Sequence, residues 1–310
     1  MNSRGALPVI IDCDPGVDDA IALLLAFASP ELHVRAVTVS AGNVGLTETT
    51  RNAAGLAALA EYAGAVIAGA DRPILGRYTY AAHVNGDDGL AGLAHKLPPG
   101  KVAPGLAADA IRDMLRGSSD KLTLVGIGPA TNFGLALATE PGLAAQVERI
   151  VLMSGAWSVG NITPQAEFNE ARDPEALAVV LACGAPVILA TLELTCQARV
   201  TRERLAALRA SCVGGAHDFA YGMLSRSLLA VAEGFKLHDV CAVAYLLRPD
   251  LFAPRRASIG VACTPGPLRG RTLIDRQNPG ESPRFIMERL EADGFFALLG
   301  ERLSALPRGA

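Results

Sequence analysis

Short apolar runs alternate with longer apolar segments along the first two thirds of the chain. Residues 7–12 form a brief apolar run that ends in a carboxylate, and residues 17–28 form a longer apolar stretch. This pair predicts a strand followed by a helix. The alternation continues, and it predicts strands at residues 32–40, 65–68, 122–126, 149–153 and 187–191 and helices at residues 46–62, 104–116, 132–139 and 174–183.

Strands that alternate with helices of this length predict right-handed βαβ crossovers and a parallel sheet buried on both faces. The expected fold class is therefore α/β, with an open, mainly parallel, Rossmann-like sheet flanked by helices. From residue 202 the pattern becomes helical, at 202–210, 216–233 and 238–247, before a Pro- and Gly-rich segment at 251–280 with short strands. Because no linker or repeat interrupts the chain, we expect a single domain over residues 1–310 with a helical C-terminal elaboration.

Charge and hydropathy exclude several classes of partner. The 310 residues include 28 Lys and Arg against 31 Asp and Glu, a formal net charge of −3, which gives no polybasic patch for nucleic acid or anionic lipid. No apolar stretch reaches the roughly 18 residues of a membrane span, and the first residues lack the pattern of a secretory signal. The six cysteines include no C-x-x-C pair, which suits reduced thiols. We expect a cytoplasmic protein that binds a small molecule, with no nucleic acid and no membrane partner.

Four carboxylates lie within eight residues at the first predicted strand-to-helix turn: Asp12, Asp14, Asp18 and Asp19. Like charges this close repel one another, and a bound cation is the simplest compensation. One or two such acids would ordinarily only cap the helix, where its dipole favours negative charge. Four acids at this spacing favour a site, and an all-oxygen set on a turn suits Ca²⁺ better than Mg²⁺ or zinc.

This turn resembles the signature of a known family. D-x-D-P-G-x-D-D-A, at residues 12–20, is similar to the motif of the inosine-uridine preferring nucleoside hydrolases, which are Ca²⁺-dependent N-ribohydrolases. Further segments match in order, up to about residue 249: A-G-N at 41–43, G-P-A-T-N at 128–132, G-N at 160–161, A-E-F-N at 166–169 and H-D at 238–239. The resemblance implies that the protein hydrolyses the N-glycosidic bond of a ribonucleoside to free base and ribose, using a Ca²⁺-bound water.

The resemblance also implies which residues bind the metal. Asp14 and Asp19 correspond to metal carboxylates, and Ile127 corresponds to a position that contributes its backbone carbonyl, for which any side chain is acceptable. Asp239 corresponds to a distant aspartate that completes the ligand set, although by itself it would equally well be a helix cap. The expected cofactor is Ca²⁺.

Three further residues are implied in the chemistry. Asp18 resembles the family's general base, which takes a proton from the attacking water. Asp12 is expected to support the turn from behind the metal. His238 is the candidate acid for the leaving base, because both protonation states of a histidine are available near neutral pH, but a role in positioning its neighbour is equally open. Negative charge around the sugar favours an oxocarbenium-like transition state, with inversion at the anomeric carbon.

Four polar residues in loops are candidates for binding ribose hydroxyls: Asn43, Asn161, Glu167 and Asn169. Their amide and carboxyl groups offer the donors and acceptors that hydroxyls need. The resemblance implies that Asn161 and Glu167 lie near the 5′-hydroxyl and that Asn43 and Asn169 lie near the 2′- and 3′-hydroxyls. A single loop asparagine is usually turn chemistry, but the spacing G-N-x₅-E-F-N makes that interpretation poor here.

The base end of the site departs from the family pattern. Asn85 stands where several relatives have a histidine, so leaving-group activation and base preference differ from theirs in this respect. The part of the predicted helix at 219–233 is expected to face the nucleobase, and Tyr221, Arg226 and Ser227 are its polar candidates.

Other functions compete with this interpretation. A haloacid-dehalogenase-like phosphatase also begins with a strand and D-x-D, but it has no use for the two further acids, Asp18 and Asp19. A non-catalytic Ca²⁺- or ribose-binding module would dispense with the base, yet Asp18 is present, while another N-ribosylated substrate for the same chemistry stays open. Because His238 is also present, the sequence predicts a ribonucleoside hydrolase of pyrimidine or mixed specificity. The resemblance implies a homodimer or homotetramer.

Overall fold

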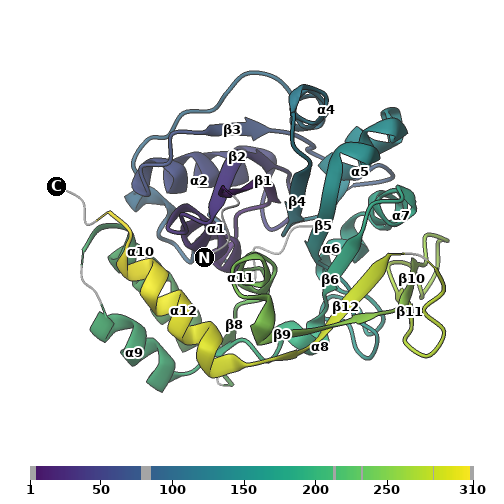
Figure 1. Ribbon diagram of the computed structural model, residues 1–310. Coiled ribbons are helices and arrows are strands. Elements are labelled where there is room, and N and C mark those ends of the chain that lie inside the picture. The colour runs from purple at the N-terminus through teal and green to yellow at the C-terminus, as the bar shows by residue number, and fades with distance from the viewer. Residues whose placement is uncertain (1–4, 78–84, 212–213, 232, 282, 308–310) are drawn as a thin grey trace.

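The computed structural model describes residues 5–77, 85–211, 214–231, 233–281 and 283–307. Its centre is an eight-stranded sheet in the order β3-β2-β1-β4-β5-β6-β12-β9 (Figure 1). Neighbouring strands are parallel except at the edge, where β9 is antiparallel to β12. The strands are β1 (Leu7–Cys13), β2 (Leu32–Val39), β3 (Ala65–Ala68), β4 (Leu122–Gly126), β5 (Val147–Met153), β6 (Val187–Ala190), β9 (Phe252–Arg256) and β12 (Arg284–Leu290). The predicted α/β class with a mainly parallel sheet is confirmed.

Helices cover both faces of the sheet. On one face a second group of helices, α9, α10 and α12, packs together farther from the sheet (Figure 1). The α-helices are α1 (Val17–Phe27), α2 (Leu46–Leu59), α4 (Ala107–Gly117), α5 (Thr131–Thr139), α6 (Phe168–Arg172), α7 (Pro174–Ala182), α8 (Leu192–Thr195), α9 (Arg202–Ser211), α10 (Gly215–Ala230), α11 (Val240–Leu247) and α12 (Ala292–Ser304). Three 3-10 helices lie at η1 (Ala94–Lys96), η2 (Pro141–Gln146) and η3 (Pro249–Leu251). Two small sheets pair β7 (Arg199–Val200) with β8 (Phe235–Lys236) and β10 (Ser258–Val261) with β11 (Thr272–Asp275).

The last part of the chain differs from the sequence prediction. No element is predicted after residue 280, whereas β12 joins the central sheet beside β6 and α12 packs against α9 and α1. Only Ile286, Met287 and Leu290 of β12 are buried. A strand with so few buried positions and several charged ones carries little hydrophobic periodicity, which is why the pattern does not reveal it.

The sheet separates two hydrophobic clusters. In β1 the side chains of Val9 and Ile11 belong to one cluster, while Ile10 between them belongs to the other. Successive side chains of a strand point to opposite faces, so a strand covered on both sides is apolar throughout. This explains why the buried strands read as continuous apolar runs.

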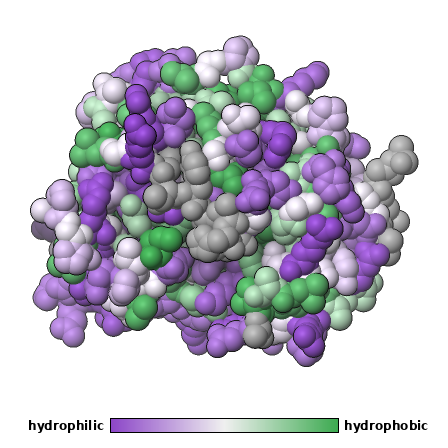
Figure 2. Space-filling model, turned by 180° about the vertical axis from the view of Figure 1, so that it is seen from behind, coloured by the Kyte–Doolittle hydropathy of each residue, from purple (hydrophilic) through white to green (hydrophobic). Residues whose placement is uncertain are grey.

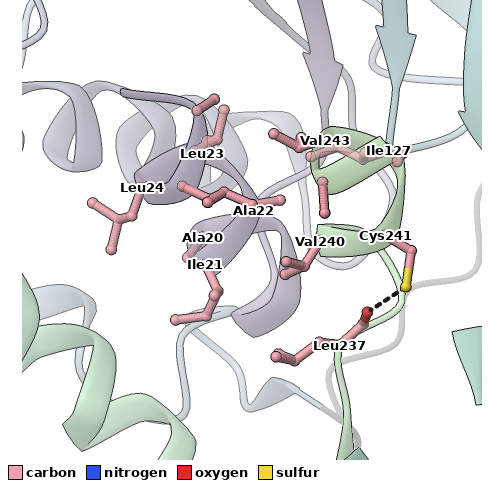
Figure 3. Close-up of a cluster of buried hydrophobic side chains, with 14 of the residues drawn as sticks. Ala20, Ile21, Ala22, Leu23, Leu24, Ile127, Leu237, Val240, Cys241 and Val243 are labelled. Atoms are coloured by element: carbon pink, nitrogen blue, oxygen red, sulfur yellow. Dashed lines mark hydrogen bonds between the residues drawn. The ribbon is translucent and has the colours of Figure 1, made fainter. Parts of the chain in front are cut away.

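Helices α1 and α11 pack together on one face of the sheet, although more than 200 residues separate them. Figure 3 shows Ile21 and Ala22 of α1 near Val240 and Val243 of α11. Ala20 and Leu23 to Leu25 are also fully buried, so α1 is enclosed on nearly all sides. This contact places the first turn of α1 beside the beginning of α11.

The surface offers no continuous apolar face in the view of Figure 2, where hydrophobic side chains form small separate groups among hydrophilic ones. Within the described ranges, no helix is both long enough and apolar enough to cross a membrane.

We expect Leu23→Ala to lower the free energy of unfolding by about 2–5 kcal/mol, because a fully buried side chain would leave a cavity in a close-packed core. Urea unfolding followed by circular dichroism measures the change. The matched control is Leu229→Ala, since Leu229 is 83% exposed, and its effect should stay within about 0.5 kcal/mol. Equal effects of the two substitutions would contradict this description of the core.

Candidate active site

The predicted site residues lie where several strands end at the same edge of the sheet. Asp14 follows β1, Asn43 follows β2 and Ile127 follows β4. Strands β1 and β4 are neighbours at the point where the strand order reverses its direction. Ligands of open parallel sheets bind in the crevice at such a switch point.

A pocket with a volume of about 280 Å³ opens at this edge. Ten of the twelve predicted site residues line it: Asp14, Asp18, Asn43, Asn85, Ile127, Asn161, Glu167, Asn169, His238 and Asp239. Asp12 and Asp19 are fully buried, and Asp19 is hydrogen-bonded to the lining residue Asn43. The structure therefore brings the first predicted motif, at residues 12–20, next to the last one, at residues 238–239.

Three carboxylates converge beside this pocket. Oxygen atoms of Asp18, Asp19 and Asp239 lie within 4.8 Å of one another, a spacing that suits a metal ion. Asp18 and Asp19 belong to the first turn of α1, and Asp239 is the N-cap residue of α11. The packing of α1 against α11 is thus what brings the acids together.

The backbone of two neighbouring loops closely surrounds the Asp14 carboxylate. The Asn43 N–H donates a hydrogen bond of 2.6 Å to Asp14 Oδ2. A Cβ atom at Gly42 would lie 2.1 Å from Asp14 Oδ2, and a Cβ atom at Gly128 would lie 2.5 Å from Asp14 Oδ1. Only glycine leaves room at these two positions, which fixes the direction of the carboxylate.

Asp19 organises the turn that precedes α1. Its carboxylate accepts hydrogen bonds from the N–H groups of Asp14 and Gly16, at 3.1 and 3.0 Å. These bonds satisfy backbone donors at the beginning of the helix. The side-chain amide of Asn43 also donates to Asp19 Oδ2, at 3.1 Å, so the loop after β2 is tied to the acidic turn.

Asn43 and Asn85 form a pair beside the acids. Asn85 Nδ2 donates to Asn43 Oδ1 at 2.8 Å, and the Val17 N–H donates to Asn85 Oδ1 at 3.3 Å. A Cβ atom at Gly16 would lie 2.7 Å from Asn43 Nδ2, so the turn approaches this pair closely. The contacts give both amides a positioning role in addition to their place in the pocket lining.

Asp12 lies behind the pocket. Its Oδ1 atom accepts hydrogen bonds from Thr38 Oγ1 at 2.6 Å and from Asn132 Nδ2 at 2.8 Å. These bonds link β1 to β2 and to the beginning of α5. These contacts fix the end of β1 just before the acidic turn, and the supporting role of Asp12 stays a prediction.

Burial and mutual repulsion raise the pKa values of the acids. Burial first, and then Asp19, raise the pKa of Asp18 to about 7. Burial, and then the charge of Asp19, also raise the pKa of Asp14 well above its usual range. Burial, and then the charge of Asp18, raise the pKa of Asp239 in the same way. Burial also raises the pKa of Asp12 to about 7. A divalent cation would favour the ionised forms and so reverse these shifts.

The segment after β5 adds polar groups to the rim. Glu167 is the N-cap residue of α6, and burial raises its pKa to about 7, although backbone N–H groups oppose the shift. Asn169 Nδ2 donates to the backbone oxygens of Ile127 and Met153, both at 3.0 Å. Asn161 is exposed at the pocket wall. Asn169 thereby orients the Ile127 carbonyl, the one backbone group predicted to bind metal.

His238 is held from the turn after β6. Its Nδ1 atom lies 2.7 Å from the hydroxyl oxygen of Thr195, which is fully buried in α8. Burial, followed by the charge of Lys236, lowers the pKa of His238 to about 4. The imidazole is therefore neutral near pH 7 in the protein.

Most of the helix predicted to face the base lies away from the pocket, and Val231 is its one lining residue among the described positions. Arg226 donates to the backbone oxygens of Ala91 and Gly92, and the Arg209 guanidinium lies over the Tyr221 ring. Tyr221, Arg226 and Ser227 are absent from the pocket lining among the described residues, and their role toward the base stays a prediction. Helix α10 ends at Ala230, and the segment that follows approaches the pocket instead.

Several residues line the pocket without having been singled out in the sequence: Met153, Ile162, Phe168, Gly234, Phe235 and Lys236, together with Val231 at the end of the helix predicted to face the base. Phe168 lies inside the A-E-F-N segment and could have been found by its position in that motif. The three residues at 234–236 carry no motif. Only their place just before the H-D pair indicated them.

The fold and the site define a class of α/β protein in which an acidic, oxygen-rich pocket at the switch point suits a cation and a polar small molecule. Comparison with known proteins identifies the family. The family model "Inosine-uridine preferring nucleoside hydrolase" matches residues 9–297. The chain is 40% identical, over 96% of its length and 98% of the relative's, to "Pyrimidine-specific ribonucleoside hydrolase RihA" of Salmonella agona (strain SL483).

Solved structures resemble the whole fold. "Purine-Preferring Ribonucleoside Hydrolase from Gardnerella vaginalis" superposes with a TM-score of 0.88 at 28% identity, over 96% of this chain and 98% of that one. "Plant nucleoside hydrolase - PpNRh1 enzyme" does so with a TM-score of 0.89 at 29% identity, over 96% and 99%. The chain belongs to the inosine-uridine preferring nucleoside hydrolase family, whose members hydrolyse N-glycosidic bonds of ribonucleosides.

We expect Gly42→Ala to lower kcat on a ribonucleoside on the order of 10²-fold, because the new Cβ would displace the Asp14 carboxylate from its position. Release of reducing sugar measures the rate, and far-ultraviolet circular dichroism checks that the variant is folded. Gly117→Ala is the control, since a Cβ there meets no atom within 4 Å. Full activity of Gly42→Ala would show that the position of Asp14 is unimportant.

Proposed function

We propose that the protein is a Ca²⁺-dependent hydrolase that cleaves the N-glycosidic bond of ribonucleosides, preferentially pyrimidine ribonucleosides, to free base and ribose. The observation that carries this proposal is the convergence of Asp18, Asp19 and Asp239 beside a pocket whose other walls offer amide and carboxyl groups. Membership in the nucleoside hydrolase family supports the reaction class.

The donor set fits a hard cation. Asp14, Asp19 and Asp239 and the carbonyl of Ile127 are the proposed ligands, and all their donor atoms are oxygen. Carboxylates and carbonyls select Ca²⁺ or Mg²⁺ over softer metals, and a site built on a turn between separate elements suits the larger, less strictly octahedral Ca²⁺. When bound, the cation would supply positive charge that stabilises the ionised acids and makes a nearby water more acidic.

Asp18 is the proposed general base. It lies in the pocket lining on the first turn of α1 and, of the acids in the cluster, is the one that is only partly buried. Its carboxylate takes a proton from the attacking water as that water bonds to the anomeric carbon. The concentration of negative charge around the ribose stabilises the oxocarbenium-like transition state, and attack from the face opposite the base gives inversion.

Glu167, Asn161 and Asn169 are the proposed ribose-binding residues on the opposite rim, joined by Asn43 at the acidic turn. Their oxygens and amide hydrogens match the capacity of sugar hydroxyls to donate and accept. His238 is the proposed donor to the leaving base. Because its pKa is lowered, it would donate the hydrogen of a neutral imidazole rather than act as an imidazolium.

Base preference, assembly and location are also proposed rather than established. The pyrimidine preference rests on the presence of His238 and on the relative "Pyrimidine-specific ribonucleoside hydrolase RihA". A homodimer or homotetramer is the assembly implied by the family resemblance. A cytoplasmic location agrees with the described cysteines, Cys13, Cys183, Cys196, Cys241 and Cys263, which are all free thiols.

We expect Asp18→Asn to lower kcat for uridine on the order of 10²- to 10⁴-fold, because the amide cannot accept the proton of the attacking water. Excess chelator should abolish wild-type activity, and added Ca²⁺ should restore it. Reducing-sugar release from a panel of purine and pyrimidine ribonucleosides and nicotinamide riboside measures both effects. Asp120→Asn is the control at an exposed acid. Activity that persists in both the chelator and Asp18→Asn would refute the mechanism.

We expect the chelated protein to lose stability as the pH rises. Asp12, Asp18 and Glu167 have folded-state pKa values of about 7, above the unfolded values near 4. Their favourable contribution is therefore complete below about pH 4 and is lost as the pH rises through about 7. Thermal unfolding in chelator at pH 5 and pH 8 measures this loss.

Added Ca²⁺ should offset the loss at pH 8, since a ligand that binds only the folded state at 100 times its Kd contributes about 2.7 kcal/mol. Asp18→Asn should show a shallower dependence on pH in chelator than the wild type, because it lacks one of the titrating groups. Chelated wild type that is more stable at pH 8 than at pH 5 would contradict the account.

A further inference from the structure

One charged side chain of the pocket has no part in the chemistry described above. Lys236 ends strand β8, lines the pocket and is partly buried. In the small antiparallel sheet it pairs with Arg199 of β7, and the next residue, Leu237, donates its N–H to the Ala198 oxygen at 2.9 Å. The backbone is therefore extended through Leu237 and up to His238.

The direction of the Lys236 side chain follows from this geometry. Successive side chains of an extended segment point to opposite sides. Leu237 is fully buried and points into the core beside α1 and α11 (Figure 3). Lys236 and His238 therefore share the other side, where both line the pocket.

Lys236 has no acid of its own. In the portion of the chain that the structure describes, the ion pairs found involve only arginines, and none includes Lys236. The pKa values of Asp18 and Asp239 are governed by burial and by neighbouring acids, whereas the charge of Lys236 acts on His238. An ammonium without a partner in a polar pocket is available to a ligand.

Cleavage of the nucleoside creates a negative charge that such a group would stabilise. The bond between the anomeric carbon and the base nitrogen breaks, and its electron pair leaves with the base. The water oxygen bonds to the anomeric carbon, and its proton passes to Asp18. The departing base takes its proton from His238, the donor proposed above, which regains one from solvent. In a pyrimidine the electron pair spreads onto the carbonyl oxygen next to the glycosidic nitrogen, so a cation near that oxygen lowers the barrier.

We propose that Lys236 is a catalytic residue at the base end of the pocket, where its ammonium binds the carbonyl oxygen beside the glycosidic nitrogen of a departing pyrimidine. This inference rests on the proposed function, which it deepens by assigning a source of base preference. A purine has no carbonyl beside its glycosidic nitrogen, so Lys236 favours pyrimidine ribonucleosides over purine ones.

The test compares substrates whose leaving groups need different amounts of help. Wild type, Lys236→Met, Lys236→Gln and Lys236→Arg are assayed on uridine, inosine and 4-nitrophenyl riboside, whose phenolate leaves readily without a cation. We expect Lys236→Met and Lys236→Gln to lower kcat/KM for uridine about 10- to 100-fold, to lower it less for inosine and to leave the nitrophenyl riboside nearly unchanged. Lys236→Arg should retain most of the uridine activity. Lys121→Met, at an exposed lysine outside the pocket, should behave as wild type.

The outcomes separate this inference from the proposed function. Unchanged uridine hydrolysis in both neutral variants would overturn the role of Lys236, and so would an equal loss on uridine and the nitrophenyl riboside in both, which would indicate a structural effect only. Activity on the nitrophenyl riboside also shows that each variant is folded. A wild-type protein that releases no ribose from any ribonucleoside would instead contradict the proposed function itself.

Discussion

The repulsion between carboxylates that are buried together is the constraint on which the site depends. Asp14, Asp19 and Asp239 are each less than 5% exposed, and none of the ion pairs found among the described residues gives any of them a cationic partner. Buried ionised groups without compensating charge are costly. The raised pKa values of Asp14 and Asp239 express this cost, and a divalent cation would remove it. The same charges that disfavour the empty site would favour a positively charged transition state.

The fold meets this constraint with rigid, closely packed supports. Asp19 belongs to the first turn of α1 and Asp239 caps α11, and the two helices bury most of their apolar side chains in the core. These two carboxylates therefore cannot move apart without opening the core. Gly42 and Gly128 close the space around Asp14, and Asn43 joins the acidic turn to the next loop. Side chains locked by packing and hydrogen bonds keep the precision that catalysis needs. Stability and chemistry therefore depend on the same contacts.

Much of this arrangement could be predicted from the sequence, for identifiable reasons. Strands that are buried on both faces, such as β1, form continuous apolar runs in the sequence, and motifs mark the ends of those strands, so the sheet and the acidic turn were both expected. Periodicity is weak in β12, where few positions are buried, and that strand was missed. The lining residues Phe235 and Lys236 were not predicted either, because α10 ends at Ala230 and these two residues follow it without a motif of their own. Contacts between residues far apart in the chain, such as the hydrogen bonds from Arg226 to the backbone oxygens of Ala91 and Gly92, cannot be predicted from the residues near them in the sequence.

The most direct test of the central claim is a calorimetric titration of the chelated protein with Ca²⁺. The account predicts one Ca²⁺ per chain, bound with release of protons near pH 7 because the acids are partly protonated without the cation. Binding should be lost in Asp239→Asn, which removes an acid far from the others in the sequence. Failure of the wild type to bind Ca²⁺, or undiminished binding by Asp239→Asn, would contradict the claim that these distant acids form one cation site.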